Sequence, residues 1–210
     1  MSRTLTFAAV LLLCACKRPQ PPDPRKGIDV SAHNRVIDWS AVSASGVTFA
    51  FIKASEGGDL IDQRFKTNAS EARAAGLEVG AYHFFTFCRP GADQAQNFLA
   101  VISSSTLSLP PVVDVEYVGN CKAAPGADQI RHELDEFLSL VETATKRELI
   151  IYTTPDADQA LLGGLKRKRW IRSIGREPEG TWDYWQHDAA GKVPGIEGDV
   201  DLDLRGRGEG

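Results

Sequence analysis

The sequence has only four cysteines, only four histidines and no excess of positive charge. Its 28 Asp and Glu outnumber its 24 Lys and Arg, which gives a formal net charge of −4. No basic surface is expected, and this argues against nucleic acid as a partner. No internal repeat and no second linker interrupts the chain. Residues 27–206 are therefore predicted to form one domain, followed by a short tail at 207–210.

The N-terminal apolar run is too short to span a bilayer as a helix. "MSRTLTFAAVLLLCAC" has one positive residue, an apolar core over residues 5–13 and then small residues, which is typical of a secretory signal. Its end, "LCAC", resembles the lipobox of bacterial lipoproteins, which implies lipid attachment to Cys16. Residues 1–15 are then a lipoprotein signal peptide, and the proline-rich residues 16–26 are a tether. The protein is expected to be exported and anchored in the cell envelope (periplasm or outer membrane); a plain secretory signal and a secreted protein are the alternative.

Apart from Cys14 in the signal and Cys16, the expected lipidation site, the chain has two cysteines, Cys88 and Cys121. In an oxidising compartment such a pair predicts one disulfide. Two free buried thiols are the alternative. Because each cysteine follows a predicted strand, a bond between them is expected to fix the loop just beyond Glu116.

Short apolar segments alternate with helical patterns along most of the chain. Segments rich in β-branched and aromatic residues predict strands at 27–31, 47–55, 77–85, 110–116 and 148–154. Apolar residues at helical spacing predict helices at 63–75, 92–103 and 127–146. The later segments "RKRWIRSI", "GTWDYWQHD" and "DVDLDL" leave little room for helices between them. The sequence thus predicts an α/β fold, an irregular TIM-like barrel of about eight strands whose last strands lack regular helices.

Acidic residues fall repeatedly at predicted strand ends. "VVDVE" places Asp114 and Glu116 two positions apart, and residues at i and i+2 of a strand share one face. The first predicted strand carries Asp29 and the last carries Asp201. The chemistry of such barrels lies at the C-terminal ends of the strands, so these four acids are expected to line one concave site.

Clustered carboxylates serve two kinds of chemistry. They bind hard cations through oxygen, or they hydrolyse glycosides, where one protonated carboxyl acts as the acid and others stabilise positive charge at the anomeric carbon. Partial burial and like charges raise the pKa of one carboxyl, as a general acid requires. Aromatic residues that could pack on sugar faces are frequent, and no histidine pair stands at metal-ligand spacing. Glycoside hydrolysis is favoured; a metal-dependent hydrolase such as a deacetylase is the weaker alternative.

Four segments resemble the family 25 glycosyl hydrolases, the Chalaropsis-type lysozymes: "GIDVSAHN", "VTFAFIKASEGG", "PPVVDVE" and "YWQHDAAGKVPGIEGDVDLDL". They occur in the family's order and span residues 27–204. The resemblance implies a flattened, irregular barrel with a groove across its C-terminal face. It also implies cleavage of the β-1,4 bond between N-acetylmuramic acid and N-acetylglucosamine in peptidoglycan, with no metal and no organic cofactor.

The resemblance assigns roles to particular residues. Glu116 corresponds to the general acid and Asp114 to its partner, and Asp29 and Asp201 complete the catalytic set. The substrate-binding residues that the resemblance implies are Tyr82, Tyr152, Trp185 and Gln186. Lys53 and Glu56, at the end of the second predicted strand, are also predicted to bind substrate, with a surface ion pair as the alternative. The implied partners are peptidoglycan glycan strands and, through Cys16, a membrane. The protein is expected to be a monomer.

Two features depart from the family's pattern. Asp203 stands where the family commonly has Asn, which adds a charge near Asp201; with Asp199 the three aspartates alternate and are expected on one face. The basic run "KRKR" at 166–169 is expected to be a solvated surface, or alternatively a contact for anionic wall polymers.

The spacing of Asp114 and Glu116 leaves three displacement routes open. A retaining enzyme with a protein nucleophile needs carboxyls about 5–5.5 Å apart and an inverting one roughly 6.5–9.5 Å, while Cβ atoms at i and i+2 of a strand lie roughly 6.5–7 Å apart. The third route uses the substrate's own N-acetyl group, oriented by Asp114, and is favoured because N-acetylated sugars carry that group. A non-catalytic peptidoglycan-binding lipoprotein is the alternative function.

Overall fold

The structure is a computed structural model that describes residue 23 and residues 25–206. The predicted signal peptide, Cys16, most of the tether and the tail at 207–210 lie outside the described residues. In the part that is described, no helix combines the length and the apolar character needed to cross a membrane.

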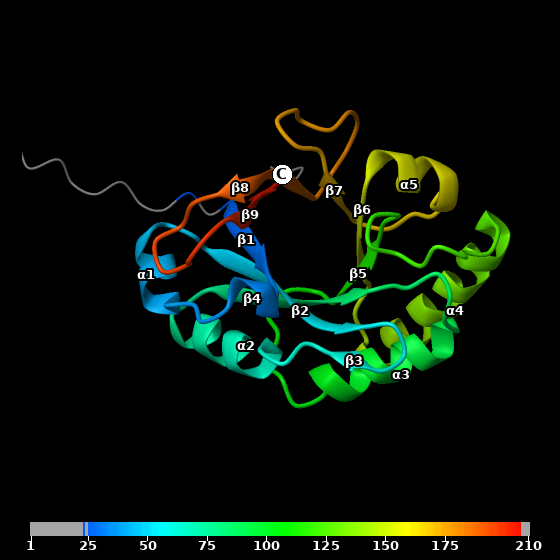
Figure 1. The fold of residues 1–210 in the computed structure, drawn as a ribbon, viewed down its shortest axis with the longest axis horizontal. Helices are drawn as coiled ribbons and strands as arrows, with labels where there is room; N and C mark the ends of the chain where they lie inside the picture. The colour runs from blue at the N-terminus through cyan, green and yellow to red at the C-terminus, as the bar shows by residue number, and fades with distance from the viewer. Residues whose placement is uncertain (1–22, 24, 207–210) are drawn as a thin grey trace, which may run out of the picture.

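Eight strands close into a barrel (Figure 1), as the sequence predicts. They are β1 (Lys26–Val30), β2 (Phe49–Glu56), β4 (Glu78–Phe84), β5 (Val112–Val115), β6 (Ile150–Thr153), β7 (Arg169–Arg172), β8 (Tyr184–Gly191) and β9 (Val200–Arg205). Their order around the barrel is β1-β9-β8-β7-β6-β5-β4-β2, and pairing of β2 with β1 closes the ring. A two-residue strand, β3 (Leu60–Ile61), pairs with the end of β2 and is not part of the ring.

The last strand runs against the others. The strands from β1 to β8 in the ring pair in parallel, whereas β9 is antiparallel to both of its neighbours, β8 and β1. Asp201 therefore lies near the N-terminal end of its strand, directly opposite Asp29 in register. The expectation that every acid follows the C-terminal end of a strand was wrong for Asp201. Reversal of β9 brings it to the same rim.

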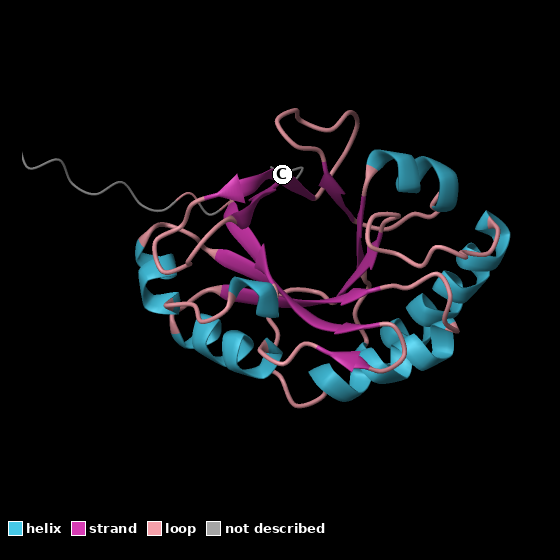
Figure 2. Ribbon diagram, in the orientation of Figure 1, coloured by secondary structure: helices cyan, strands magenta, loops and turns pink. Residues whose placement is uncertain are grey.

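Helices cover only one part of the barrel (Figure 2). They are α1 (Trp39–Ala44), α2 (Phe65–Ala74), α3 (Gly91–Ile102), α4 (Ala127–Thr145) and α5 (Pro155–Leu161), with a 3₁₀ turn at Ala32–Asn34. The three predicted helices correspond to α2, α3 and α4. The sequence prediction missed α1 and α5, because six and seven residues are too few to show a helical period. Within the described chain, the connections from β7 to β8 and from β8 to β9 contain no helix, as predicted.

Apolar side chains fill both faces of the barrel wall. Outside, the buried stripe of α4 packs over the strands: Ile130, Leu134, Phe137, Leu138 and Val141. Inside, Phe51 stacks on Trp170 with 4.5 Å between ring centroids. Gly80 leaves the room for this ring, because a Cβ there would lie 2.5 Å from Phe51. Aromatic rings thus fill the barrel interior, and they form the floor of the space at its mouth.

A disulfide between Cys88 and Cys121 joins the segment after β4 to the loop after β5. Asn120 ties the same two segments together: its Nδ2 donates to the carbonyls of Phe85 (2.9 Å) and Glu116 (3.0 Å). The loop that begins at Glu116 is therefore held by one covalent bond and by side-chain hydrogen bonds to the backbone.

The basic run at 166–169 is not the freely solvated surface that was expected. Arg167 Nε pairs with Glu142 at 2.9 Å, and Arg169 Nε pairs with Asp158 at 2.7 Å. Only 26% and 13% of these two arginine side chains are exposed. These arginines fasten β7 and the turn before it to α4 and α5, so the expectation was wrong for both.

Candidate active site

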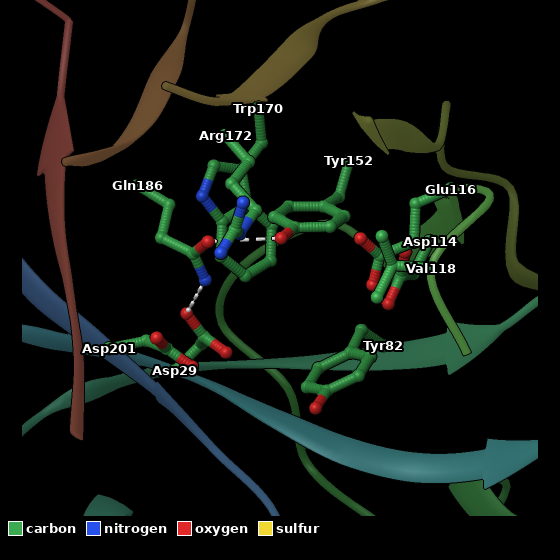
Figure 3. A pocket seen from close by; sticks show the side chains of 10 residues that line it. All are labelled: Asp29, Tyr82, Asp114, Glu116, Val118, Tyr152, Trp170, Arg172, Gln186 and Asp201. Carbon is green, nitrogen blue, oxygen red and sulfur yellow. Dashed lines mark hydrogen bonds between the residues drawn. The ribbon is translucent and has the colours of Figure 1, made fainter. Parts of the chain in front are cut away.

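A pocket of roughly 240 Å³ opens at the mouth of the barrel. Ten residues line it (Figure 3): Asp29, Tyr82, Asp114, Glu116, Val118, Tyr152, Trp170, Arg172, Gln186 and Asp201. The four acids predicted to converge are all among them. Asp114 and Glu116 lie on one side of the pocket and Asp29 and Asp201 on the other.

Asp114 and Glu116 come from β5 and the residue just after it. Asp114 is 6% exposed, while Glu116 is half-buried. The apolar residues around Asp114 on β5 are fully buried, so this strand cannot shift its register without burying the wrong side chains. The Oδ1 atom of Asp114 has no hydrogen-bond partner among the described residues. That oxygen is available to a donor that enters the pocket.

Asp29 is held by a chain of hydrogen bonds that crosses the barrel (Figure 3). Gln186 Nε2 donates to Asp29 Oδ2 at 2.7 Å, and the Tyr152 hydroxyl donates to Gln186 Oε1 at 3.0 Å. Gln186 is 3% exposed and Tyr152 6%. The sequence prediction grouped Tyr152 and Gln186 as substrate-binding residues. In the structure they line the pocket and also orient a carboxylate.

Burial and mutual repulsion keep protons in this cluster. Burial raises the pKa of Glu116, and the charge of Asp201 adds to the rise while the Arg172 guanidinium opposes it. Burial and then the charge of Glu116 raise the pKa of Asp114 well above its ordinary value. Burial also raises the pKa of Asp201. Carboxyls this close cannot all ionise together, so the pocket can hold a proton donor at neutral pH.

Arg172 and Trp170 line the pocket but are not among the site residues predicted from the sequence. Both lie on β7, two positions apart. Arg172 is the lining residue that carries a positive charge, and it lowers the pKa of both Glu116 and Asp201. The sequence "WIR" could have predicted that Trp170 and Arg172 both face the pocket, because residues at i and i+2 near the end of a barrel strand face the same way.

Three predicted substrate-binding residues do not line the pocket. Lys53 Nζ pairs with Glu56 at 2.6 Å at the end of β2, and it acts on the pocket only through its charge. Trp185 precedes Gln186 on β8, so it points to the opposite face of the sheet. Its Nε1 donates to the carbonyl of Ser173 at 2.7 Å, and its ring packs edge-on against Trp182 on the outer surface.

The three aspartates of the last segment also separate. Asp201 lines the pocket, Asp203 lies beneath it with 1% exposure, and Asp199 is exposed and pairs with Lys192 at 2.6 Å. Asp199 precedes the first residue of β9, so the strand alternation does not extend to it. The expectation that all three share one face holds for two of them.

The carboxyl groups of the pocket suit acid catalysis on a polar substrate whose reacting centre is uncharged or positively charged. Among the described residues, no group of three or more His, Cys, Asp or Glu is arranged to hold a metal ion. The aromatic floor and the carboxylate walls instead match what a sugar ring presents, an apolar face and a rim of hydroxyls.

Comparison with known proteins agrees with this geometry. Residues 28–196 match the family described as glycosyl hydrolases family 25. "Lysozyme M1" of Streptomyces globisporus is 36% identical over 196 residues, covering 84% of this chain and 66% of that protein. This chain thus spans about two thirds of the length of that relative.

Two solved structures are similar over nearly the whole described domain. A family 25 glycosyl hydrolase from Bacillus anthracis aligns with a TM-score of 0.81 at 33% identity, covering 88% of this chain and 90% of that one. A bacterial lysozyme from Streptomyces coelicolor aligns with a TM-score of 0.77 at 33% identity, covering 86% and 91%.

Proposed function

The chain belongs to the glycosyl hydrolases of family 25, and from this premise we propose that it is a lysozyme that hydrolyses peptidoglycan. The bond cleaved is the β-1,4 linkage between N-acetylmuramic acid and N-acetylglucosamine. The observation that carries the proposal is the convergence of four carboxyl groups from β1, β5 and β9 on one aromatic-floored pocket. A protein that only binds glycan strands gains nothing from holding four like charges together.

Glu116 is the general acid of the proposed reaction. It is half-buried at the pocket wall and burial raises its pKa, so it keeps its proton to higher pH than an ordinary glutamate. It donates that proton to the glycosidic oxygen as the bond from this oxygen to the anomeric carbon breaks. The hydrogen bond from Asn120 to the Glu116 carbonyl (3.0 Å) and the nearby disulfide support its position.

Asp114 serves the displacement step. Its Oδ1, buried and without a partner, is placed to accept a hydrogen bond from the N–H of the substrate's N-acetyl group. The acetyl oxygen then attacks the anomeric carbon while the leaving oxygen takes the proton of Glu116. Water subsequently opens the cyclic intermediate and returns a proton to Glu116. Asp29 and Asp201, on the opposite wall, stabilise the positive charge that develops on the sugar.

The test compares the wild-type protein with Glu116→Gln on purified peptidoglycan, with muropeptides analysed by mass spectrometry. Wild type is expected to release products with N-acetylmuramic acid at the reducing end. E116Q is expected to lose about 10²–10⁴-fold in rate, because a carboxamide has no proton to give. Glu136→Gln, an exposed change on α4, is the matched control and keeps the wild-type rate.

Three results would contradict these assignments. Reducing-end N-acetylglucosamine would rule out muramidase action. Equal rates for E116Q and wild type would remove Glu116 as the acid. Binding of peptidoglycan by wild type without release of products would leave a glycan-binding protein instead of an enzyme.

We also propose that the protein is exported and anchored to the cell envelope by lipid on Cys16, where its substrate lies. The lipobox-like "LCAC" and the proline-rich residues that follow support this. Cys16→Ala is expected to abolish incorporation of labelled fatty acid and recovery with membranes, whereas Cys14→Ala keeps both. Equal labelling of the two variants would refute the assignment.

A further inference from the structure

Asp203 lies beneath the pocket and has one carboxyl oxygen without a donor. On β9 it pairs in register with Gly27 of β1 and Gln186 of β8, and it is 1% exposed. Trp170 Nε1 donates to its Oδ1 at 2.8 Å. Its Oδ2 has no hydrogen-bond donor among the described residues. Such a buried acceptor is costly unless the oxygen carries a proton of its own and donates it.

The group positioned to accept that proton is Asp29. The two carboxyl groups lie on the paired strands β1 and β9, both turn to the barrel interior, and they are within hydrogen-bonding reach of each other. Two ionised carboxylates have no proton to form such a bond, so the pair holds one proton. Asp29 already accepts the 2.7 Å hydrogen bond from Gln186 through its Oδ2.

The surroundings decide which of the two keeps the proton. Asp203 faces Asp29 of β1 and Asp201 of its own strand, while Trp170 of β7 and Gln186 of β8 present neutral groups. Burial, and then the charge of Asp29, raises the pKa of Asp203 well above its ordinary value. Burial and then the charge of Asp201 raise the pKa of Asp29 as well, but the contacts with Gln186 and Asp203 oppose that rise, whereas the contact with Asp29 adds to the rise at Asp203. Asp203 is also the more deeply buried, at 1% against 8%.

We propose that Asp203 is a positioning residue of the catalytic site, whose neutral carboxyl donates a hydrogen bond to Asp29 and aims the Asp29 carboxylate into the pocket. This inference rests on the proposed function. Asp29 is then held by two donors, Asp203 from below and Gln186 from the side. The Tyr152 hydroxyl fixes Gln186 in turn at 3.0 Å.

The first test measures kcat and KM on peptidoglycan for Asp203→Ala and Asp203→Asn. D203A removes the donor, so kcat is expected to fall about tenfold or more with little change in KM. D203N supplies an N–H in the same place and is expected to recover most of that loss. If D203N is as impaired as D203A, a hydrogen-bond donor at this position is not what Asp29 needs, and the proposal is wrong.

The second test detects the shared proton without reference to activity. In the unfolded chain Asp203 loses its proton above the ordinary pKa of an aspartate, whereas in the folded protein it keeps that proton. The free energy of unfolding of wild type therefore falls as pH rises from the ordinary pKa toward the raised pKa of folded Asp203. Relative to D203N, the wild-type unfolding constant is expected to rise about tenfold per pH unit from about pH 4 upward, until Asp203 itself ionises. Denaturant titrations at a series of pH values measure this directly, and they need only D203N and wild type to fold.

Asp199→Asn is the matched control, because Asp199 is an exposed aspartate close to the same strand with 59% of its side chain accessible. Its unfolding constant is expected to follow the pH dependence of wild type. Parallel curves for wild type and D203N would show that Asp203 holds no extra proton and would overturn the proposal. Failure of the proposed function is distinguishable, since wild type would then release no muropeptides whatever the unfolding curves show.

Discussion

Gln186 bridges two opposite parts of the barrel wall, and replacing it tests the hydrogen-bond chain behind the carboxylates. Gln186→Leu keeps the side chain's approximate size and removes both of its polar atoms. The 2.7 Å bond to Asp29, which is the ionised member of the proposed pair with Asp203, is lost, at about 1.5–3 kcal/mol, and the buried Tyr152 hydroxyl is left without an acceptor, at about 1–3 kcal/mol. Burial of the additional apolar surface offsets about 1–2 kcal/mol of this loss.

The net expectation is a loss of about 2–4 kcal/mol in the free energy of unfolding, measured by urea titration at neutral pH with an unchanged m value. Gln96→Leu, on the exposed face of α3, is the control and should change stability by less than about 0.5 kcal/mol. In a double-mutant cycle with Tyr152→Phe, a coupling of at least about 0.5 kcal/mol is expected, because the two side chains share one bond. A Q186L protein as stable as wild type, or strict additivity with Y152F, would refute the reasoning.

Three other perturbations follow from charge and packing. Arg172→Met removes the cation that lowers the pKa of Glu116, so the alkaline limb of kcat/KM should move to higher pH; an unmoved limb would contradict this. Burial lowers the pKa of His83 to about 3, so the unfolded chain binds a proton below its ordinary pKa of 6.5 while the native state does not. Relative to His83→Gln, wild type should therefore lose about 4–5 kcal/mol of unfolding free energy as pH falls from 7 to 3, and equal slopes would exclude this. Gly91→Ala would place a Cβ 1.9 Å from the Glu133 carbonyl oxygen and should cost about 1–3 kcal/mol, whereas Gly126→Ala meets open space and should cost well under that; denaturant titration of the pair measures the difference.

Local periodicity was enough to place Asp114 and Glu116. An apolar strand that ends in D-x-E puts both carboxylates on one face whatever the rest of the chain does. The same argument could have removed Trp185 from the predicted site, since its neighbour Gln186 faces the pocket and adjacent residues on a strand cannot both do so. It could also have added Arg172, two positions after Trp170 on β7.

Direction and pairing of strands were beyond that kind of inference. "DVDLDL" reads the same in a parallel or an antiparallel strand, and only closure of the barrel by β9 between β8 and β1 sets Asp201 opposite Asp29. The bond between Gln186 and Asp29 joins residues 157 positions apart. No local period carries information over that distance, because the loops between the strands could satisfy several pairings.

By itself, then, the sequence determined which chemistry the chain carries: the order of strands and helices, the acids at the strand ends and the cysteine pair. These features depend on hydrophobic alternation and residue type, which act over a few neighbouring positions. Only the tertiary structure decided which carboxyls are buried together and therefore have a raised pKa. A pKa depends on burial and on charges brought together from β1, β5, β7 and β9, and Asp203, expected from the sequence to share a face with Asp201, becomes a buried neighbour of Asp29 only when the barrel has closed.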